Sequence, residues 1–258
     1  METFHKVGSR RAIVTEAASL RWLLVPGGAA VARLKGVGST WLTTGLLDPG
    51  TPSRLDAERF GRRLAVTHAA GAGWWGQAPL EMSPADLTLA ELPAPAAARP
   101  TWSTFGEFYA EARCRPYVLM AGGLSDDERA LLHRACDVIA GGRFDSPQPS
   151  RCRDVARIHG DLWGGNIVWA IQGDGTVGTL IDPCAHGGHA ETDLAELGLF
   201  GSDHLDATIA GYQEISLLAD GWEERIPVHQ FHMLLVHVVL FQGVFVSRAL
   251  DEARRIVG

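Results

Sequence analysis

The sequence predicts an α+β protein in which a small mixed β/α region precedes a larger, mainly helical region with one embedded β-hairpin. Short strand-like segments are concentrated before residue 46. Apolar residues recur at helical spacing over most of the remaining chain. The exception is a pair of strand-like segments around a glycine-rich turn near residue 174. We therefore expect two units, residues 1–46 and residues 47–258.

The first unit is predicted to contain three strands and one helix. Residues 4–7 (Phe-His-Lys-Val) form a short strand. Thr15 then caps a helix whose apolar residues recur every three to four positions, and Pro26 marks its end. Residues 30–34 and 40–44 form two further strands joined by a glycine turn. The boundary between the two units follows the last of these strands.

Helices and one surface crossing are expected in the middle of the chain. A helix spans residues 53–68, with Phe60 and Leu64 on its buried face. Residues 78–100 are rich in proline and alanine and are expected to cross the surface. The segment Ser125–Glu128 has the residue types of a capping box, which predicts that a helix begins there.

A hairpin and an apolar helix are predicted in the last third. Residues 167–171 and 177–181 flank the turn Gly-Asp-Gly at 173–175, which is typical of a β-hairpin. Residues 233–246 form the most apolar stretch, but they are too few to cross a bilayer and they include His237. We expect this stretch to be a buried core helix.

Composition and charge exclude several classes of protein. The hydrophobic share of 46% and the charged share of 21% are ordinary for a globular protein with a sizeable core. A net charge of −7 argues against nucleic acid as the main partner, because phosphate backbones attract basic surfaces. The four cysteines are scattered, which favours a reduced intracellular protein. With neither a signal peptide nor a membrane span recognised, we expect a cytoplasmic protein without a membrane partner.

The segment that carries chemistry runs from His159 to Asn166 and reads His-Gly-Asp-Leu-Trp-Gly-Gly-Asn, with Asp182 sixteen residues beyond it. Phosphoryl transfer needs a carboxylate that accepts a proton from the attacking hydroxyl, and oxygen ligands that hold Mg²⁺ against the nucleotide phosphates. Protein kinases place Asn five residues after the catalytic Asp, and a metal-binding Asp beyond a hairpin. Asp161, Asn166 and Asp182 keep this order. We expect both loops at the ends of strands in one sheet.

Two segments resemble the fructosamine kinase (ketosamine-3-kinase) family of aminoglycoside-phosphotransferase-like kinases. One is residues 159–166; the other, residues 181–195, reads Ile-Asp-Pro-Cys-Ala-His-Gly-Gly-His-Ala-Glu-Thr-Asp-Leu-Ala. The resemblance implies a two-lobed protein-kinase-like fold with a truncated mixed β/α N-terminal lobe and a mainly helical C-terminal lobe. It also implies an ATP-dependent enzyme that phosphorylates the sugar 3-hydroxyl of ketosamines on glycated amines, as a deglycation step.

The resemblance also implies roles for individual residues. Asp161 corresponds to the catalytic base, and Asn166 and Asp182 correspond to the ligands of Mg²⁺. Lys6 is similar to the lysine that binds the α- and β-phosphates of ATP, with Glu16 as its ion-pair partner. Both also have ordinary interpretations, as a solvated lysine and as a first-turn helix residue favoured by the helix dipole.

Four further residues are expected around these five. By the same resemblance, Thr44 ends the strand that leads into the hinge, whose backbone would bond adenine. Trp163 offers a flat ring to the C–H face of a sugar, although core packing explains it equally well. His159 and Asp193 are expected to fix the catalytic loops by hydrogen bonds rather than to touch substrate.

The histidines suggest one alternative, a zinc hydrolase. His186 and His189 stand three residues apart, and Asp182, Glu191 and Asp193 supply carboxylates nearby. However, the two glycines between the histidines predict a loop rather than the helix that presents paired ligands in zinc proteases. We therefore favour the kinase interpretation.

A second alternative is a kinase-like binding protein with impaired catalysis. Kinases cover the nucleotide phosphates with a glycine-rich hairpin before the lysine strand, and such a hairpin needs about 15 residues. Five residues precede Lys6. Either the start lies inside a longer gene, or the chain is a shortened member with weakened ATP binding. A related aminoglycoside- or choline-type phosphotransferase is also open, as are the accepted ketosamine and the oligomeric state.

Overall fold

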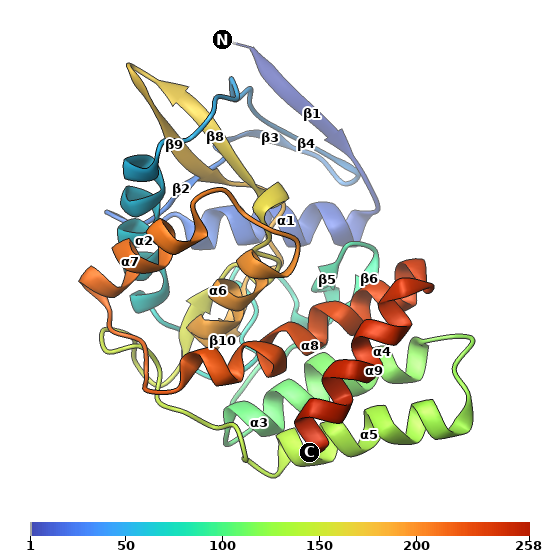
Figure 1. Ribbon diagram of the computed structural model, residues 1–258. Helices are drawn as coiled ribbons and strands as arrows, with labels where there is room; N and C mark the ends of the chain where they lie inside the picture. Colours follow the sequence, from blue (N-terminus) through green and yellow to red (C-terminus); the bar gives the residue numbers. More distant parts are fainter. Residues whose placement is uncertain (1) are drawn as a thin grey trace.

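The computed structural model describes residues 2–258, in which small sheets and helix α1 lie above a larger helical body (Figure 1). The strands are β1 (Thr3–Val7), β2 (Ala30–Val31), β3 (Leu34–Val37), β4 (Trp41–Gly45), β5 (Thr88–Leu89), β6 (Leu92–Pro93), β7 (Ala156–Ile158), β8 (Ile167–Gln172), β9 (Gly175–Leu180) and β10 (His186–Gly188). The helices are α1 (Arg10–Leu23), α2 (Arg54–Ala69), α3 (Phe105–Phe108), α4 (Arg115–Met120), α5 (Asp126–Ala140), α6 (Ala190–Leu199), α7 (Leu205–Ile215), α8 (Trp222–Phe241) and α9 (Val244–Val257). Two 3-10 turns, η1 (Pro84–Asp86) and η3 (Gly164–Asn166), and the π-helix η2 (Tyr109–Cys114) complete the order.

Strand β1 lies at the edge of an antiparallel sheet with the order β1-β4-β3. Helix α1 packs under this sheet and buries Leu20 and Leu23 (Figure 1). Ser9 caps the helix, because its side chain accepts a hydrogen bond from the amide of Ala12. The prediction that Thr15 caps this helix was wrong. Thr15 lies buried in the second turn, where its hydroxyl has a long-range partner described below.

The two strands predicted between residues 30 and 44 are three in the structure. β2 pairs in parallel with β9 of a second sheet, whereas β3 pairs with β4. The chain changes sheets at Ala32 and Arg33: the amide of Ala32 bonds Leu180, and the carbonyl of Arg33 bonds Gly45. Local composition does not reveal such a change of sheet, so residues 30–34 were predicted to form one strand. The boundary near residue 46 stays a prediction.

The predicted hairpin is confirmed as β8 and β9, which pair antiparallel from Ile167↔Leu180 to Gln172↔Gly175. Its turn is Gly173-Asp174, and Gly173 has a φ of +66°, where glycine costs least. Phe60 from α2 packs edge-on against Trp169 on the hairpin, with ring centroids 5.6 Å apart. The hairpin is thereby fixed against α2.

The helical body is built from α3 to α5, η2, α8 and α9 around one apolar core. The predicted capping box of α5 is confirmed, since the side chains of Ser125 and Glu128 bond each other's backbone amides; such a cap contributes about 1 kcal/mol. The prediction that residues 233–246 form one helix was wrong. Gln242 and Gly243 have φ values of +52° and +59°, which end α8 before α9 begins. No helix within residues 2–258 combines the length and the apolar character needed to cross a membrane.

Candidate active site

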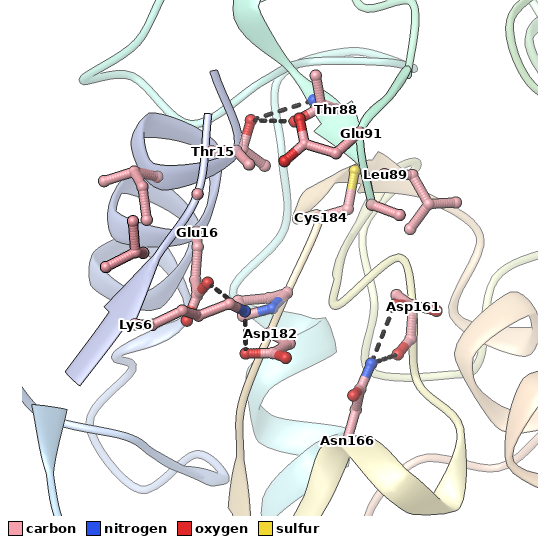
Figure 2. Close-up of a pocket in the computed structure, with 16 residues that line it drawn as sticks. Lys6, Thr15, Glu16, Thr88, Leu89, Glu91, Asp161, Asn166, Asp182 and Cys184 are labelled. Atoms are coloured by element: carbon pink, nitrogen blue, oxygen red, sulfur yellow. Dashed lines mark hydrogen bonds and ion pairs between the residues drawn. The ribbon is translucent and has the colours of Figure 1, made fainter. Parts of the chain in front are cut away.

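Five of the predicted site residues line one cavity of about 340 Å³ (Figure 2). They come from four segments of the chain: strand β1, helix α1, the loop after β7 and the loop after β9. These five residues are Lys6, Glu16, Asp161, Asn166 and Asp182. The structure therefore gathers residues that are up to 176 positions apart in sequence around one space.

The loop after β7, residues 159–166, is held from behind by helix α6. Asp193 accepts the amides of His159 and Gly160 at 2.7 and 2.9 Å, and Glu196 accepts the amide of Leu162 at 3.0 Å. Burial raises the pKa of Asp193, but the hydrogen bonds from His68 and from the loop amide outweigh it and leave that pKa below its usual value. A buried, ionised carboxylate thus fixes the backbone immediately before Asp161.

Gly160 is required by its surroundings and not only by its φ of +77°. A Cβ on Gly160 would lie 2.3 Å from the carbonyl oxygen of Cys184 and 2.8 Å from the His186 ring. The loop after β7 therefore passes against the loop after β9 at van der Waals distance.

The expectation that both loops lie at the ends of strands in one sheet is confirmed by β8 and β9. The first loop enters β8 directly after Asn166, Asp182 follows β9, and these two strands pair at Ile167↔Leu180. The strand before the first loop, β7, belongs to a different sheet and pairs with β10. The loops are joined by other bonds: His159 Nε2 donates to the carbonyl of Ile181 at 3.0 Å, and the amide of Ile181 bonds the carbonyl of Asn166 at 3.1 Å. His159 Nδ1 accepts the amide of Asp161 at 3.3 Å, so this buried ring uses both nitrogens as scaffold.

Asp161 and Asn166 are in direct contact. The side-chain amide of Asn166 donates to the backbone carbonyl of Asp161 at 2.8 Å and to its carboxylate at 3.0 Å (Figure 2). Burial, with a smaller contribution from the nearby Asp182 and Asp193, raises the pKa of Asp161 to about 7 against the lowering effect of the bond from Asn166. Since the amide nitrogen of Asn166 is used in this contact, its oxygen remains an acceptor for another group.

Asp182 follows β9 with a φ of +54°, a conformation that is strained for a residue other than glycine. Its carboxylate lies 2.8 Å from Lys6 Nζ, and Glu16 lies 2.8 Å from the same nitrogen (Figure 2). Burial lowers the pKa of Lys6, but the bonds to Asp182 and Glu16 outweigh it and raise that pKa overall. Burial raises the pKa of Glu16 to about 7, against the lowering effect of Lys6. One lysine therefore joins β1, α1 and the loop after β9.

A second cavity of about 330 Å³ adjoins the first on the other side of Lys6. Its walls are mainly apolar and include Phe4, Leu46 and Ile181. Thr44, predicted at the end of the hinge strand, is buried and lines this second cavity. The two cavities share Lys6, Glu16 and Asp182, so an elongated ligand can extend from one into the other.

Trp163 does not line either cavity. Its ring is 39% exposed and packs edge-on against Phe200 at 6.0 Å. Phe200 in turn packs against His237 and Phe245, with ring centroids 4.8 and 6.3 Å away. Trp163 is therefore the first ring of a partly exposed aromatic cluster next to the loop after β7.

The segment that was predicted to be a plain surface crossing supplies part of the cavity wall. Its η1 turn and its β5–β6 hairpin pack along α1, and Leu87 and Leu89 are buried. Thr15 donates to the carbonyl of Asp86 at 3.0 Å and accepts the amide of Thr88 at 3.1 Å. The proline-rich composition gave no signal of this contact, because it depends on where α1 lies.

His186 and His189 do not come together in the way that the zinc alternative requires. His186 accepts a hydrogen bond from Arg113, whereas His189 caps helix α6. His189 instead approaches Glu191 and His229 closely enough for a shared ion. However, Arg225 donates to both oxygens of Glu191 at 2.8 and 2.6 Å, so protein donors already use this carboxylate.

Comparison with known proteins agrees with this geometry. The family model described as fructosamine kinase matches residues 8–257. A "Probable ketoamine kinase" from Klebsiella aerogenes is 32% identical over 211 residues, which are 78% of this chain and 66% of that relative. The chain thus spans slightly less than two thirds of that relative's length. A crystal structure of a candidate fructosamine-3-kinase from Thermobifida fusca has a TM-score of 0.85 at 37% identity, covering 99% of this chain and 85% of that one.

More distant structures define the fold. The ADP-bound aminoglycoside phosphotransferase APH(2'')-Ib has a TM-score of 0.60 at 10% identity, over 99% of this chain and 88% of that one. At this identity the likeness shows the fold alone, and it confirms the predicted two-lobed α+β fold of the aminoglycoside phosphotransferases. Since the family model matches nearly the whole length, this chain belongs to the fructosamine kinase family.

Proposed function

We propose that this protein is an ATP-dependent kinase that phosphorylates the sugar 3-hydroxyl of ketosamines formed on glycated amines. The observation that carries the proposal is the single cavity lined by Lys6, Glu16, Asp161, Asn166 and Asp182. Membership of the fructosamine kinase family supports the substrate class. The product would be a ketosamine 3-phosphate, so the protein would act in deglycation.

Asp161 is proposed as the catalytic base. It would accept the proton of the sugar hydroxyl while that oxygen forms a bond to the γ-phosphorus of ATP. The bond between this phosphorus and the β–γ bridging oxygen breaks, and ADP leaves with that oxygen. The hydrogen bond from Asn166 and the amides held by Asp193 would keep the carboxylate of Asp161 in place during the transfer.

Asn166 and Asp182 are proposed as the ligands of Mg²⁺. They offer an amide oxygen and a carboxylate, the hard oxygen donors that Mg²⁺ prefers, and both line the cavity. The bound ion would neutralise charge on the phosphate oxygens. The strained backbone at Asp182 is consistent with a position selected for its direction rather than for stability.

The two cavities suggest how the nucleotide would bind. The apolar second cavity, with Thr44 in its wall, suits the adenine, and the chain after Thr44 would supply backbone bonds to its edge. Lys6, between the cavities, would bind the α- and β-phosphates, and its ion pair with Glu16 would orient it. Trp163, outside both cavities, would pack on the sugar or the amine part of the acceptor.

The test is an assay of the purified chain with ATP, Mg²⁺ and a panel of fructosyl, ribulosyl and erythrulosyl amines. We expect ADP release that depends on a ketosamine, with a phosphate at the 3-position of the product by ³¹P NMR. Choline and an aminoglycoside serve as control acceptors. Turnover of a control acceptor but of no ketosamine would contradict the proposed substrate class.

A further inference from the structure

Three residues that line one small cavity behind the two loops of the site each have a buried polar atom without a hydrogen-bond partner within residues 2–258. These atoms are Nη2 of Arg113, Oε1 of Glu196 and Nε2 of His232. Each side chain is at most 3% exposed. All three residues line a cavity of about 10 Å³ between η2, α6 and α8.

The charges around this cavity are otherwise poorly matched. Arg113 donates from Nε to His186 at 3.3 Å and from Nη1 to the carbonyl of Pro95 at 2.7 Å, and both acceptors are uncharged. Its guanidinium also lies 4.9 Å from the centre of the Phe108 ring. Buried groups of this kind cost free energy unless each polar atom is bonded. Glu196 uses only Oε2, which accepts the amide of Leu162. Burial and the neighbouring Asp193 and Asp161 raise the pKa of Glu196 well above its usual value.

We propose that this cavity binds one water molecule that bridges Arg113, Glu196 and His232. The water would accept a hydrogen bond from Nη2 of Arg113 and would form hydrogen bonds with Oε1 of Glu196 and Nε2 of His232. A space of about 10–15 Å³ for the water centre holds one molecule, and buried waters usually make about three bonds. The volume and the number of unpaired atoms both match these values.

An ion fits this set of groups less well than water does. The guanidinium of Arg113 would repel a metal cation, and the ionised Asp193 close to Glu196 disfavours a halide. Water can act as donor or as acceptor, as each of the three groups requires. The cavity is also too small for a second molecule or for a polyatomic anion.

The bridging water would connect the supports of both loops that carry the proposed catalytic residues. Glu196 holds the amide of Leu162, the residue after Asp161. On the other side, Arg113 bonds His186, whose Nδ1 donates to the carbonyl of Cys184, two residues after Asp182. Arg113 belongs to a π-helix, an irregular helix form that is common at functional sites. Arg113, Glu196 and His232 are therefore assigned as positioning residues.

A crystal structure of the unsubstituted chain at about 1.5 Å resolution tests the water site without reference to the proposed kinase activity. We expect one density peak within about 2.6–3.2 Å of all three named atoms. Direct contact between Arg113 and Glu196, with no peak between them, would overturn the proposal. Crystals grown with bromide provide the second arm, since an anomalous peak in the cavity would identify an anion instead of water.

The positioning role rests on the proposed function and is tested by kinetics. His232→Phe keeps a ring of similar size but removes Nε2, so the water loses one partner. We expect kcat to fall about threefold to tenfold, the effect of one hydrogen bond, with little change in the KM for ATP. His133→Phe, on the partly exposed surface of α5, is the matched control. A variant that loses melting temperature but keeps the parent kcat would show that the water is merely structural.

Discussion

The two sides of the candidate site are held in place by different kinds of interaction. The loop around Asp161 is bonded from behind by Asp193 and Glu196, both of which are buried. On the opposite side, Lys6 is 33% exposed and reaches Asp182, which is 43% exposed. Exposed ion pairs contribute little to stability, whereas buried charges are costly to disrupt. One side is thus fixed by folding, while the other is free to exchange partners when a ligand enters.

The largest effect expected on the fixed side is catalytic. Asp161→Asn keeps the size and polarity of the side chain but removes the group that accepts the hydroxyl proton. General-base catalysis contributes about 10²–10⁴-fold, so we expect kcat for a ketosamine to fall by that factor. ADP release measures it, and circular dichroism checks that the fold is unchanged. Asp174→Asn, in the exposed hairpin turn, is the control. Near-parental turnover by Asp161→Asn would reassign Asp161 to a structural role.

The second prediction tests the support of that loop. Asp193→Ala removes the acceptor of two loop amides and of His68, and leaves these donors buried without a partner. Each such donor costs about 1–3 kcal/mol, so we expect the free energy of unfolding to fall by about 3 kcal/mol or more. Asp206→Ala, which breaks an exposed ion pair with Arg54, should leave the free energy of unfolding nearly unchanged. If both variants lost the same free energy of unfolding in urea, the proposed difference between the two sides of the site would be contradicted.

The third prediction concerns the exchangeable side. Lys6→Met removes the cation between Glu16 and Asp182 but leaves the apolar part of the side chain. A charge-assisted bond to phosphate contributes about 1.5–3 kcal/mol, so we expect the Kd for ATP to rise roughly 10–100-fold with little change in stability. The sequence offers a matched control, since the exposed Lys35 of β3 is the only other lysine. If Lys35→Met weakened ATP binding as much, the role of Lys6 would be a matter of net charge.

Sequence reasoning succeeded where function requires a fixed spacing. Asp161, Asn166 and Asp182 were predicted from their separations along the chain, and the structure brings them to one cavity. It failed where contacts depend on packing. Thr15 has the residue type of a helix cap, but its partners are Asp86 and Thr88, more than seventy positions away.

Glu196 shows the same limit more clearly. In the sequence it is an ordinary helical glutamate, and only the direction of α6 brings its carboxylate to the amide of Leu162. The roles of the site residues stay predictions, because geometry alone does not assign them.

The smallest expected effect is a change in the pH dependence of stability. It tests the side of the site around Asp161, because the buried His189 caps helix α6 on that side. Burial, together with the neighbouring His229, lowers the pKa of His189 to about 3. The unfolded chain binds this proton below about pH 6.5, whereas the folded protein does not until about pH 3. The contribution of His189 to stability is therefore complete above pH 6.5 and is lost as pH falls toward 3, at up to about 1.4 kcal/mol per pH unit.

His189→Gln removes this titration, although it also costs stability at neutral pH because His189 caps α6. Only the slope of the free energy of unfolding between pH 6 and pH 4 is therefore compared. Buried groups that His189 does not influence cancel in the difference. Glu191, whose pKa His189 helps to lower, has a pKa of about 2, which is below this pH range. We expect the slope of His189→Gln to be smaller by about 1 kcal/mol per pH unit, while His5→Gln on exposed β1 keeps the parental slope. Identical slopes for all three proteins would mean that His189 takes up its proton without unfolding, and that this support is looser than its burial implies.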